Sequence, residues 1–182
     1  MAMLPNPRYQ PTDTDPQWLR FAAQFHGHLG PWAAAGLRAG AAARRAVRAK
    51  GYFDVDVVVE GSLGQTPNSC FLDGVQVSTG ATWGKHNIAW TAGEKLVLRM
   101  KNLRSGATVE VHPSPALLEI LVSLKTTPKV GAEEKSDDLG DAHDGSPGDS
   151  HDHHHSDNPA EALARKVAGM SDETLFEIVV GN

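Results

Sequence analysis

Two histidines close together in the sequence are the first candidates for chemistry. His26 and His28 lie directly before a helix that we expect to begin at Gly30-Pro31. Residues two apart in an extended segment point to the same side. The positive end of the following helix favours the neutral imidazole that binds metals. From spacing alone, a capping or packing role explains this pair equally well.

The single cysteine is the second candidate, because it lies at the start of an expected helix over residues 70–78. The dipole stabilises a thiolate in the first helical turn, so Cys70 could bind a metal. Asp73 follows on the same helix face, as a further ligand or as the acceptor for a ligating histidine. The alternative is that Cys70 is a small buried apolar side chain, the commoner environment of a lone cysteine.

A third segment, residues 79–86 (Thr-Gly-Ala-Thr-Trp-Gly-Lys-His), superficially resembles a phosphate-binding loop. It is one residue too short for that motif, and His86 stands where the motif needs a hydroxyl group for magnesium. Nucleotide hydrolysis is therefore excluded. Lys85 remains a candidate contact for an anion, and a solvated loop lysine is the alternative.

Together, the three segments resemble the FmdE family, which takes its name from one of the proteins of molybdenum formylmethanofuran dehydrogenase. The family motifs are a helix start HGHxCPG, a C-x-x-D-x-x-Q helix and a T-G-C-T-x-G-K loop. They correspond here to residues 26–31, 70–76 and 79–85. Their order and spacing agree over roughly Trp18 to Leu124.

The resemblance implies an α+β fold and a metal site, usually zinc, at the histidine and cysteine segments. The ligands that it implies here are His26, His28, Cys70 and Asp73. The substrate-binding residues that we assign on the same motifs are Lys85, Thr82 and Gln76.

The chain also departs from the family motifs. Gly30 and Ala81 stand where the family usually has cysteines, and the CxxC ribbon that ends some members is missing. The remaining ligand set of nitrogen, sulfur and oxygen atoms is chemically harder, in the hard/soft sense, than a set with two more thiolates. It predicts either zinc with an open position for water or substrate, or no metal.

The family is associated with one-carbon metabolism on pterin and methanofuran carriers, which are anionic. We therefore expect a cytoplasmic, homo-oligomeric zinc protein that binds or acts on such a carrier, with a one-carbon enzyme as a partner. One alternative is an accessory protein that sequesters or delivers metal. Another is an assembly subunit with a vestigial site.

A histidine-rich acidic segment lies near the end of the chain. Interleaved imidazoles and carboxylates bind zinc, nickel or copper without a fixed fold, and a solvated spacer is the alternative. The histidine run is internal and interrupted by Asp152, unlike an expression tag. The histidines of this tail are His143, His151, His153, His154 and His155.

Charge divides the chain into a basic body and an acidic tail. The 182 residues carry a net charge of −5, yet residues 132–158 hold nine acidic residues and one basic residue. The body, residues 1–131, carries +5, which favours small anionic ligands and argues against nucleic acid. One cysteine excludes an internal disulfide, and no apolar run approaches the ~20 residues of a membrane span.

The pattern of apolar and turn residues predicts an α+β domain of two or three helices against a mostly antiparallel sheet. Asp15-Pro16 is expected to cap the first helix. Residues 1–131 form the expected metal-binding domain, 132–158 a disordered linker, and 159–182 a segment of two short helices. The expected body helices end at Gly27, Lys50, Ser78 and Leu124, and the expected strands are 53–60, 86–91, 95–102 and 108–112.

Overall fold

The structure is a computed structural model in which residues 4–123 and 158–181 are described. Those residues form a five-stranded sheet and six α-helices, which confirms the expected α+β class. The expected linker at 132–158 lies outside the described residues, apart from Asn158. Within the described ranges, no helix is long and apolar enough to cross a membrane.

The strands are β1 (Val55–Glu60), β2 (Ile88–Thr91), β3 (Val97–Asn102), β4 (Thr108–Pro113) and β5 (Phe176–Gly181). Their order in the sheet is β2-β1-β3-β4-β5, in which β1 and β2 pair parallel and the three other pairs are antiparallel. The mostly antiparallel sheet is thus confirmed. On β1, Val55, Val57 and Val59 are fully buried and the alternate residues are more exposed, so one face of the sheet carries the core.

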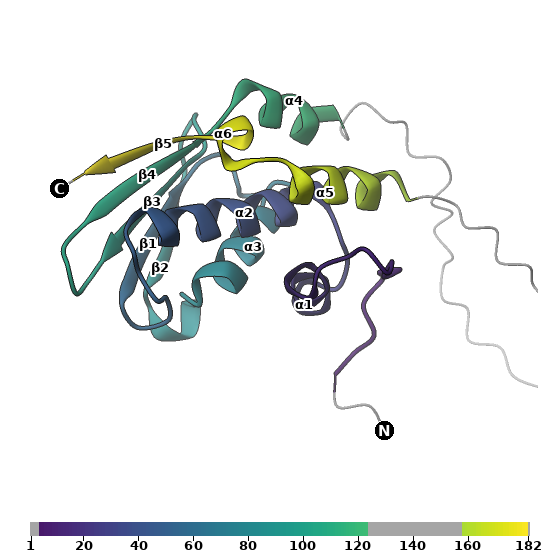
Figure 1. The fold of residues 1–182 in the computed structure, drawn as a ribbon, viewed down its shortest axis with the longest axis horizontal. Helices are drawn as coiled ribbons and strands as arrows, with labels where there is room; N and C mark the ends of the chain where they lie inside the picture. The colour runs from purple at the N-terminus through teal and green to yellow at the C-terminus, as the bar shows by residue number, and fades with distance from the viewer. Residues whose placement is uncertain (1–3, 124–157, 182) are drawn as a thin grey trace, which may run out of the picture.

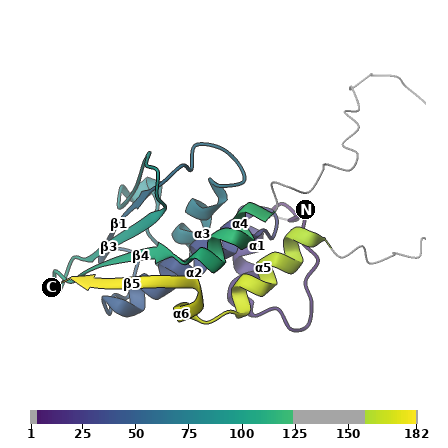
Figure 2. The ribbon, with the colours of Figure 1, turned by 90° about the horizontal axis from the view of Figure 1, so that it is seen from above.

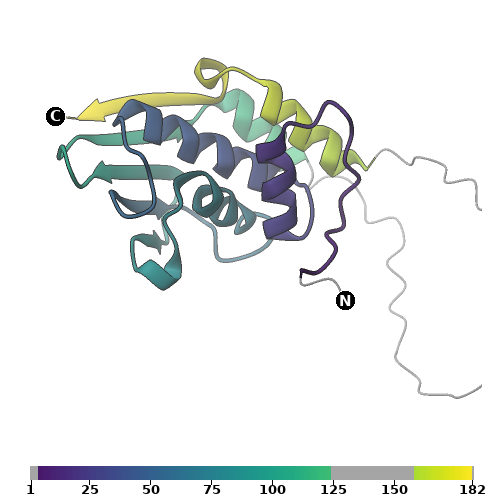
Figure 3. The ribbon, with the colours of Figure 1, turned by 60° about the horizontal axis from the view of Figure 1, so that its bottom comes forward.

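The helices are α1 (Gln17–His26), α2 (Pro31–Ala46), α3 (Cys70–Thr79), α4 (Pro115–Ser123), α5 (Pro159–Gly169) and α6 (Asp172–Leu175), and a 3-10 helix η1 (Trp83–Lys85) precedes β2. Helix α2 is central, because it lies between α3 and α5 and contacts three strands of the sheet (Figures 1 and 3). It ends at Ala46, before the expected Lys50, and Arg48 then takes a left-handed φ of 52°.

Two glycines allow α2 and α3 to pack very closely. A Cβ added at Gly36 of α2 would lie 2.0 Å from the Phe71 carbonyl oxygen, and one at Gly74 of α3 would lie 2.1 Å from the Ala33 carbonyl oxygen. Neither position leaves room for a side chain. This contact fixes the start of α3 relative to the start of α2, which is where the candidate ligands lie.

The C-terminal segment corrects one expectation. Residues 159–169 form the expected helix α5, but the second expected helix, 171–180, is helical only over α6. The chain then continues as β5, which pairs antiparallel with β4 over six residues (Figure 2). The apolar residues that we assigned to a helix face therefore extend the sheet, because β4 offers a free edge for hydrogen bonding.

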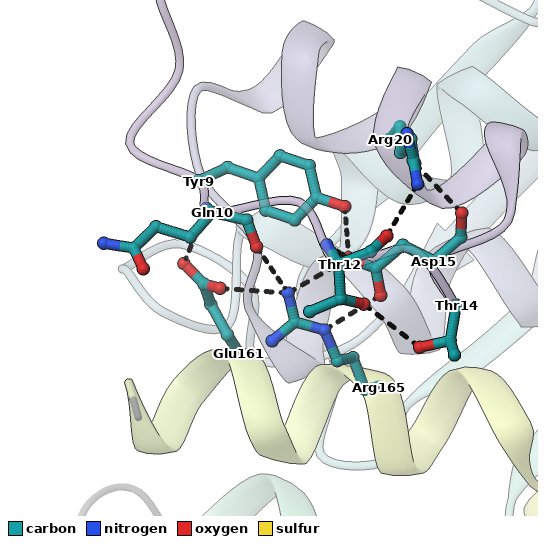
Figure 4. A network of polar contacts seen from close by, with 8 residues as sticks. All are labelled: Tyr9, Gln10, Thr12, Thr14, Asp15, Arg20, Glu161 and Arg165. Atoms are coloured by element: carbon teal, nitrogen blue, oxygen red, sulfur yellow. Dashed lines mark hydrogen bonds and ion pairs between the residues drawn. The ribbon is translucent and has the colours of Figure 1, made fainter. Parts of the chain in front are cut away.

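A polar network joins the N-terminal arm to α5, although the two segments are far apart in the sequence (Figure 4). The buried Asp15 carboxylate accepts hydrogen bonds from Arg165 at 2.8 Å, from the Tyr9 hydroxyl at 2.6 Å and from the Thr12 amide at 2.9 Å. The expectation that Asp15 caps α1 is therefore wrong, since Pro16 is the N-cap residue and makes no side-chain bond. Asp15 anchors the arm instead.

Candidate metal centre

Three chain segments bring the candidate ligands to one place. Helix α1 ends at His26, and Gly27 follows with φ +88°, a left-handed conformation that suits glycine and turns the chain. His28 then lies in the short connection to α2, where its segment forms an isolated bridge with Arg8 of the N-terminal arm. Cys70 is the first residue of α3.

The ligand atoms of His26, His28 and Cys70 all lie within 4.8 Å of one another. The two imidazole rings have centroids 4.3 Å apart and planes tilted by 42°. Cys70 is buried, His26 is half-buried and His28 is exposed, so the group opens towards solvent on the His28 side. Nitrogen and thiolate ligands in such a group suit zinc and other borderline divalent metals.

Asp73 lies behind His26 rather than within the group of three. Its Oδ2 accepts a hydrogen bond from His26 Nδ1 at 2.6 Å. The other ring nitrogen, Nε2, is buried and has no hydrogen-bond partner among the described residues. A metal-binding histidine typically donates one ring N–H to a carboxylate and binds the metal through the other ring nitrogen. The orphaned Nε2 therefore fits a metal ion.

The pKa values of the two histidines are shifted in opposite directions when no metal is bound. The hydrogen bond to Asp73, followed by the influence of the nearby Cys70, raises the pKa of His26 to about 9. Desolvation and the neighbouring His26 lower the pKa of His28. A bound cation would replace the proton that His26 otherwise holds, because metals bind the neutral imidazole.

Gln76 connects Asp73 to the loop that carries Lys85. Its side-chain amide donates to Asp73 Oδ1 at 3.3 Å, and its carbonyl oxygen accepts from the Trp83 amide at 3.4 Å. Both functional groups of this buried side chain are thus used within the protein. The family motif predicts a substrate-binding role for Gln76, and in the structure its two hydrogen bonds join α3 to η1.

The two remaining predicted residues lie together on this loop. Lys85 Nζ donates to Thr82 Oγ1 at 2.9 Å and lies 5.7 Å from the centre of the Phe53 ring. This bond uses one of the three protons on the ammonium group. The structure therefore pairs Thr82 and Lys85 with each other. The hydrogen bonds of Gln76 connect their loop to Asp73, which lies behind His26.

Comparison with known protein families gives one match over most of the chain. A family model described as FmdE, molybdenum formylmethanofuran dehydrogenase operon, matches residues 25–177. The chain belongs to the FmdE family. The match runs from the end of α1 into β5 and includes all three residues of the candidate metal group. No curated protein matches the chain.

This FmdE protein has a glycine beside the metal group, where the family motif has a cysteine. A Cβ at Gly30 would lie 3.4 Å from His28 Nε2, in ordinary van der Waals contact. A side chain at this position would thus reach the group, whereas glycine contributes no ligand atom of its own. Ala81, the second missing cysteine, is fully buried. The tail histidines lie outside the described residues.

Sequence reasoning missed the anchoring role of Asp15 and Arg165. The two residues lie 150 positions apart, on opposite sides of the acidic segment. A carboxylate and a guanidinium at that separation leave no periodic or spacing signal. The one local hint is that a Pro follows Asp15, which equally suits a helix start.

Proposed function

We propose that this FmdE protein is a cytoplasmic divalent-metal protein of one-carbon metabolism, with zinc as its preferred metal. His26, His28 and Cys70 bind the metal, and Asp73 orients His26. The observation that carries the proposal is the convergence of three ligand atoms within 4.8 Å, with a buried His26 Nε2 that has no other partner among the described residues. A free cysteine is kept reduced in the cytosol, which favours the cytoplasm.

Three protein ligands would leave a further coordination position for water or substrate, and Gly30, beside His28, adds no side chain to the group. Structural zinc sites normally have four protein ligands, whereas catalytic sites have three and an open position. A metal in this site supplies a Lewis acid or activates a bound water. The neighbouring residues orient the His26 ligand. Asp73 accepts a hydrogen bond from the His26 ring, and Gln76 donates one to Asp73.

The ligand that we propose is an anionic pterin-type or furan-type one-carbon carrier, and a one-carbon enzyme is the proposed partner. The family description supports the pathway, and the net charge of +5 on residues 1–131 supports an anionic ligand. Lys85 is the proposed contact for the anion, because two of its three ammonium protons are not used by Thr82.

The proposal is tested by the metal content of the full chain and of a chain without residues 132–157. The deletion removes the tail histidines and keeps α5 and β5, which a chain ending at Gly131 would lose. We expect one tightly held equivalent of zinc in the shortened chain, and its loss in His28→Ala and in Cys70→Ser. His86→Ala, which changes a histidine on the Lys85 loop, is the matched control and should keep the metal. Full occupancy in both ligand variants would overturn the assignment.

A second candidate is a metal-sequestering or metal-delivering accessory protein, which the histidine tail supports. In that case, nickel or another divalent metal binds weakly and in several equivalents to residues 143–155. Deletion of 132–157 should then abolish metal transfer to a partner. If the body retains its tight equivalent after the deletion, the two sites are separate. An assembly subunit with a vestigial site predicts no tight equivalent at all.

A further inference from the structure

The two edges of the sheet differ in how well they are protected. At one edge, β2 is only four residues long, Ile88 is buried, and the Trp90 indole donates to the Gly61 carbonyl. At the other edge, β5 exposes three consecutive aliphatic side chains: Ile178, Val179 and Val180 are 36%, 49% and 56% exposed. Figures 1 and 2 show β5 as the outermost strand.

Strand β5 also lacks the features that normally prevent edge-to-edge pairing. Edge strands are usually interrupted by lysine, proline or a bulge. The sequence of β5 is Phe-Glu-Ile-Val-Val-Gly, with no lysine or proline, and its register with β4 is continuous from Phe176 to Gly181. Such a strand is a template for one more antiparallel strand.

The register with β4 fixes which backbone groups of β5 point outward. The Ser114 amide donates to the Leu175 carbonyl at 2.8 Å. Because hydrogen-bonded and non-hydrogen-bonded pairs alternate in an antiparallel ladder, Glu177 and Val179 turn their backbone groups towards β4. Ile178 and Val180 therefore direct their N–H and C=O groups away from the sheet.

We infer that β5 pairs with β5 of a second copy of this chain, antiparallel, around a two-fold axis at Val179. In this register, Ile178 of one copy lies opposite Val180 of the other, and the two residues form hydrogen bonds through their outward N–H and C=O groups. Val179 lies opposite Val179 of the second copy. Glu177 lies opposite Gly181, so no carboxylate faces another. A two-fold axis makes one strand its own complement, and the dimer contains a continuous sheet that joins the two five-stranded halves.

The inference is tested first by the mass of the full chain in solution. Light scattering should give twice 19.4 kDa for the wild type. Val179→Lys places two like charges directly opposite each other and should give the monomer mass. Val179 pairs with Glu110 on β4, so a lysine at 179 is compatible with the fold. Val179→Thr is the matched control and should remain dimeric. A wild type that is monomeric at all concentrations overturns the inference, and so does a Val179→Lys variant that stays dimeric.

A disulfide test fixes the register independently. Directly opposed residues of a non-hydrogen-bonded antiparallel pair have Cα atoms about 4.5 Å apart, which a disulfide can span. Val179→Cys should therefore form a covalent dimer under mild oxidation. Glu177→Cys, opposite Gly181, should not, and the native Cys70 is buried. Equal crosslinking by both variants, or by neither, contradicts pairing centred on Val179.

Discussion

Asp73 and His26 are 47 residues apart in the sequence, and the carboxylate accepts a hydrogen bond from the imidazole Nδ1 at 2.6 Å. The bond ties the end of α1 to the first turn of α3. It places the proton of a neutral imidazole on Nδ1 and leaves the buried Nε2 as the nitrogen with a free lone pair. The two residues therefore decide which atom of His26 can bind a metal.

The first prediction concerns this bond. Asp73→Asn should lower zinc affinity about ten- to a hundred-fold, since the residue that orients a ligating histidine contributes that much. In the metal-free protein, the variant should also lower the pKa of His26 from about 9 towards 6.5, because Asp73 is the main cause of its elevation. Chelator competition and NMR titration measure the two effects.

A matched control for this prediction is Asp56→Asn, which changes an exposed carboxylate on β1. It should alter neither zinc affinity nor the pKa of His26. An Asp73→Asn variant with unchanged affinity but a lowered pKa would show that His26 is not a ligand.

A second prediction uses the glycine beside the metal group. Gly30 has φ −138° and ψ 156°, an extended conformation that other residues adopt without strain. Gly30→Cys should therefore add a thiolate next to His28 and raise zinc affinity by about ten-fold or more. The cobalt-substituted protein should show stronger thiolate-to-cobalt absorption. Gly30→Ala, which adds the Cβ without the thiol, should leave affinity and spectrum unchanged.

How much of the site could be predicted from the sequence depends on the range of each contact. The helix start at Cys70 and the connection that carries His28 follow from local signals: turn glycines, a proline after Gly30 and the apolar pattern of 70–79. That these segments meet was predicted only through the family motifs. Periodicity does not specify that α1 and α3 come together in space.

The strand β5 shows where local signals were ambiguous. Ser171-Asp-Glu-Thr is a sound helix start, and the Ser171 side chain does accept from the Thr174 amide. The following Phe-Glu-Ile-Val-Val run suits either a helix face or a strand, because β-branched residues favour strands only moderately. The free edge of β4 decides between them, and that edge belongs to a segment about seventy residues earlier in the chain.

A third prediction tests the close contact of α2 and α3. Gly74→Ala should destabilise the protein by about 3 kcal/mol, in the range of overpacked cores, despite the better helix propensity of alanine. The reason is that the new Cβ would lie 2.1 Å from the Ala33 carbonyl oxygen and 2.5 Å from the Leu37 amide nitrogen. Chemical unfolding measures the loss. Gly84→Ala, whose Cβ meets nothing within 4 Å, should be close to neutral.

A fourth prediction concerns acid stability. Burial raises the pKa of Asp15, but hydrogen bonds from Arg165, Tyr9 and Thr12 outweigh it and hold the pKa well below its usual value. A depressed carboxylate pKa contributes stability that is complete above the unfolded pKa and is lost as the pH falls through the folded pKa. Asp15→Asn should therefore cost about 2–4 kcal/mol at pH 5–8.

The pH dependence of that difference is the decisive measurement. The stability gap between the wild type and Asp15→Asn should stay constant above about pH 5 and narrow at lower pH. The variant should also lower the pKa of Tyr9 from about 12, because Asp15 adds to the effect of burial there. Asp13→Asn, an exposed carboxylate two residues away, is the control. A gap that widens towards acid pH would contradict the assignment.

The last prediction separates an enzyme or carrier-binding protein from a metal-delivering one. Lys85 extends from η1, and the bond to Thr82 leaves two ammonium protons for an anion. Lys85→Ala should keep the bound zinc and weaken an anionic methanopterin-type or methanofuran-type ligand. Loss of one charge-assisted contact is worth about 1.5–3 kcal/mol, or roughly ten- to a hundred-fold in affinity. Lys101→Ala, an exposed lysine on β3, should bind like the wild type. Calorimetric titration decides: if the wild type binds none of these carriers while zinc transfer depends on residues 132–157, the one-carbon assignment fails and the accessory role replaces it.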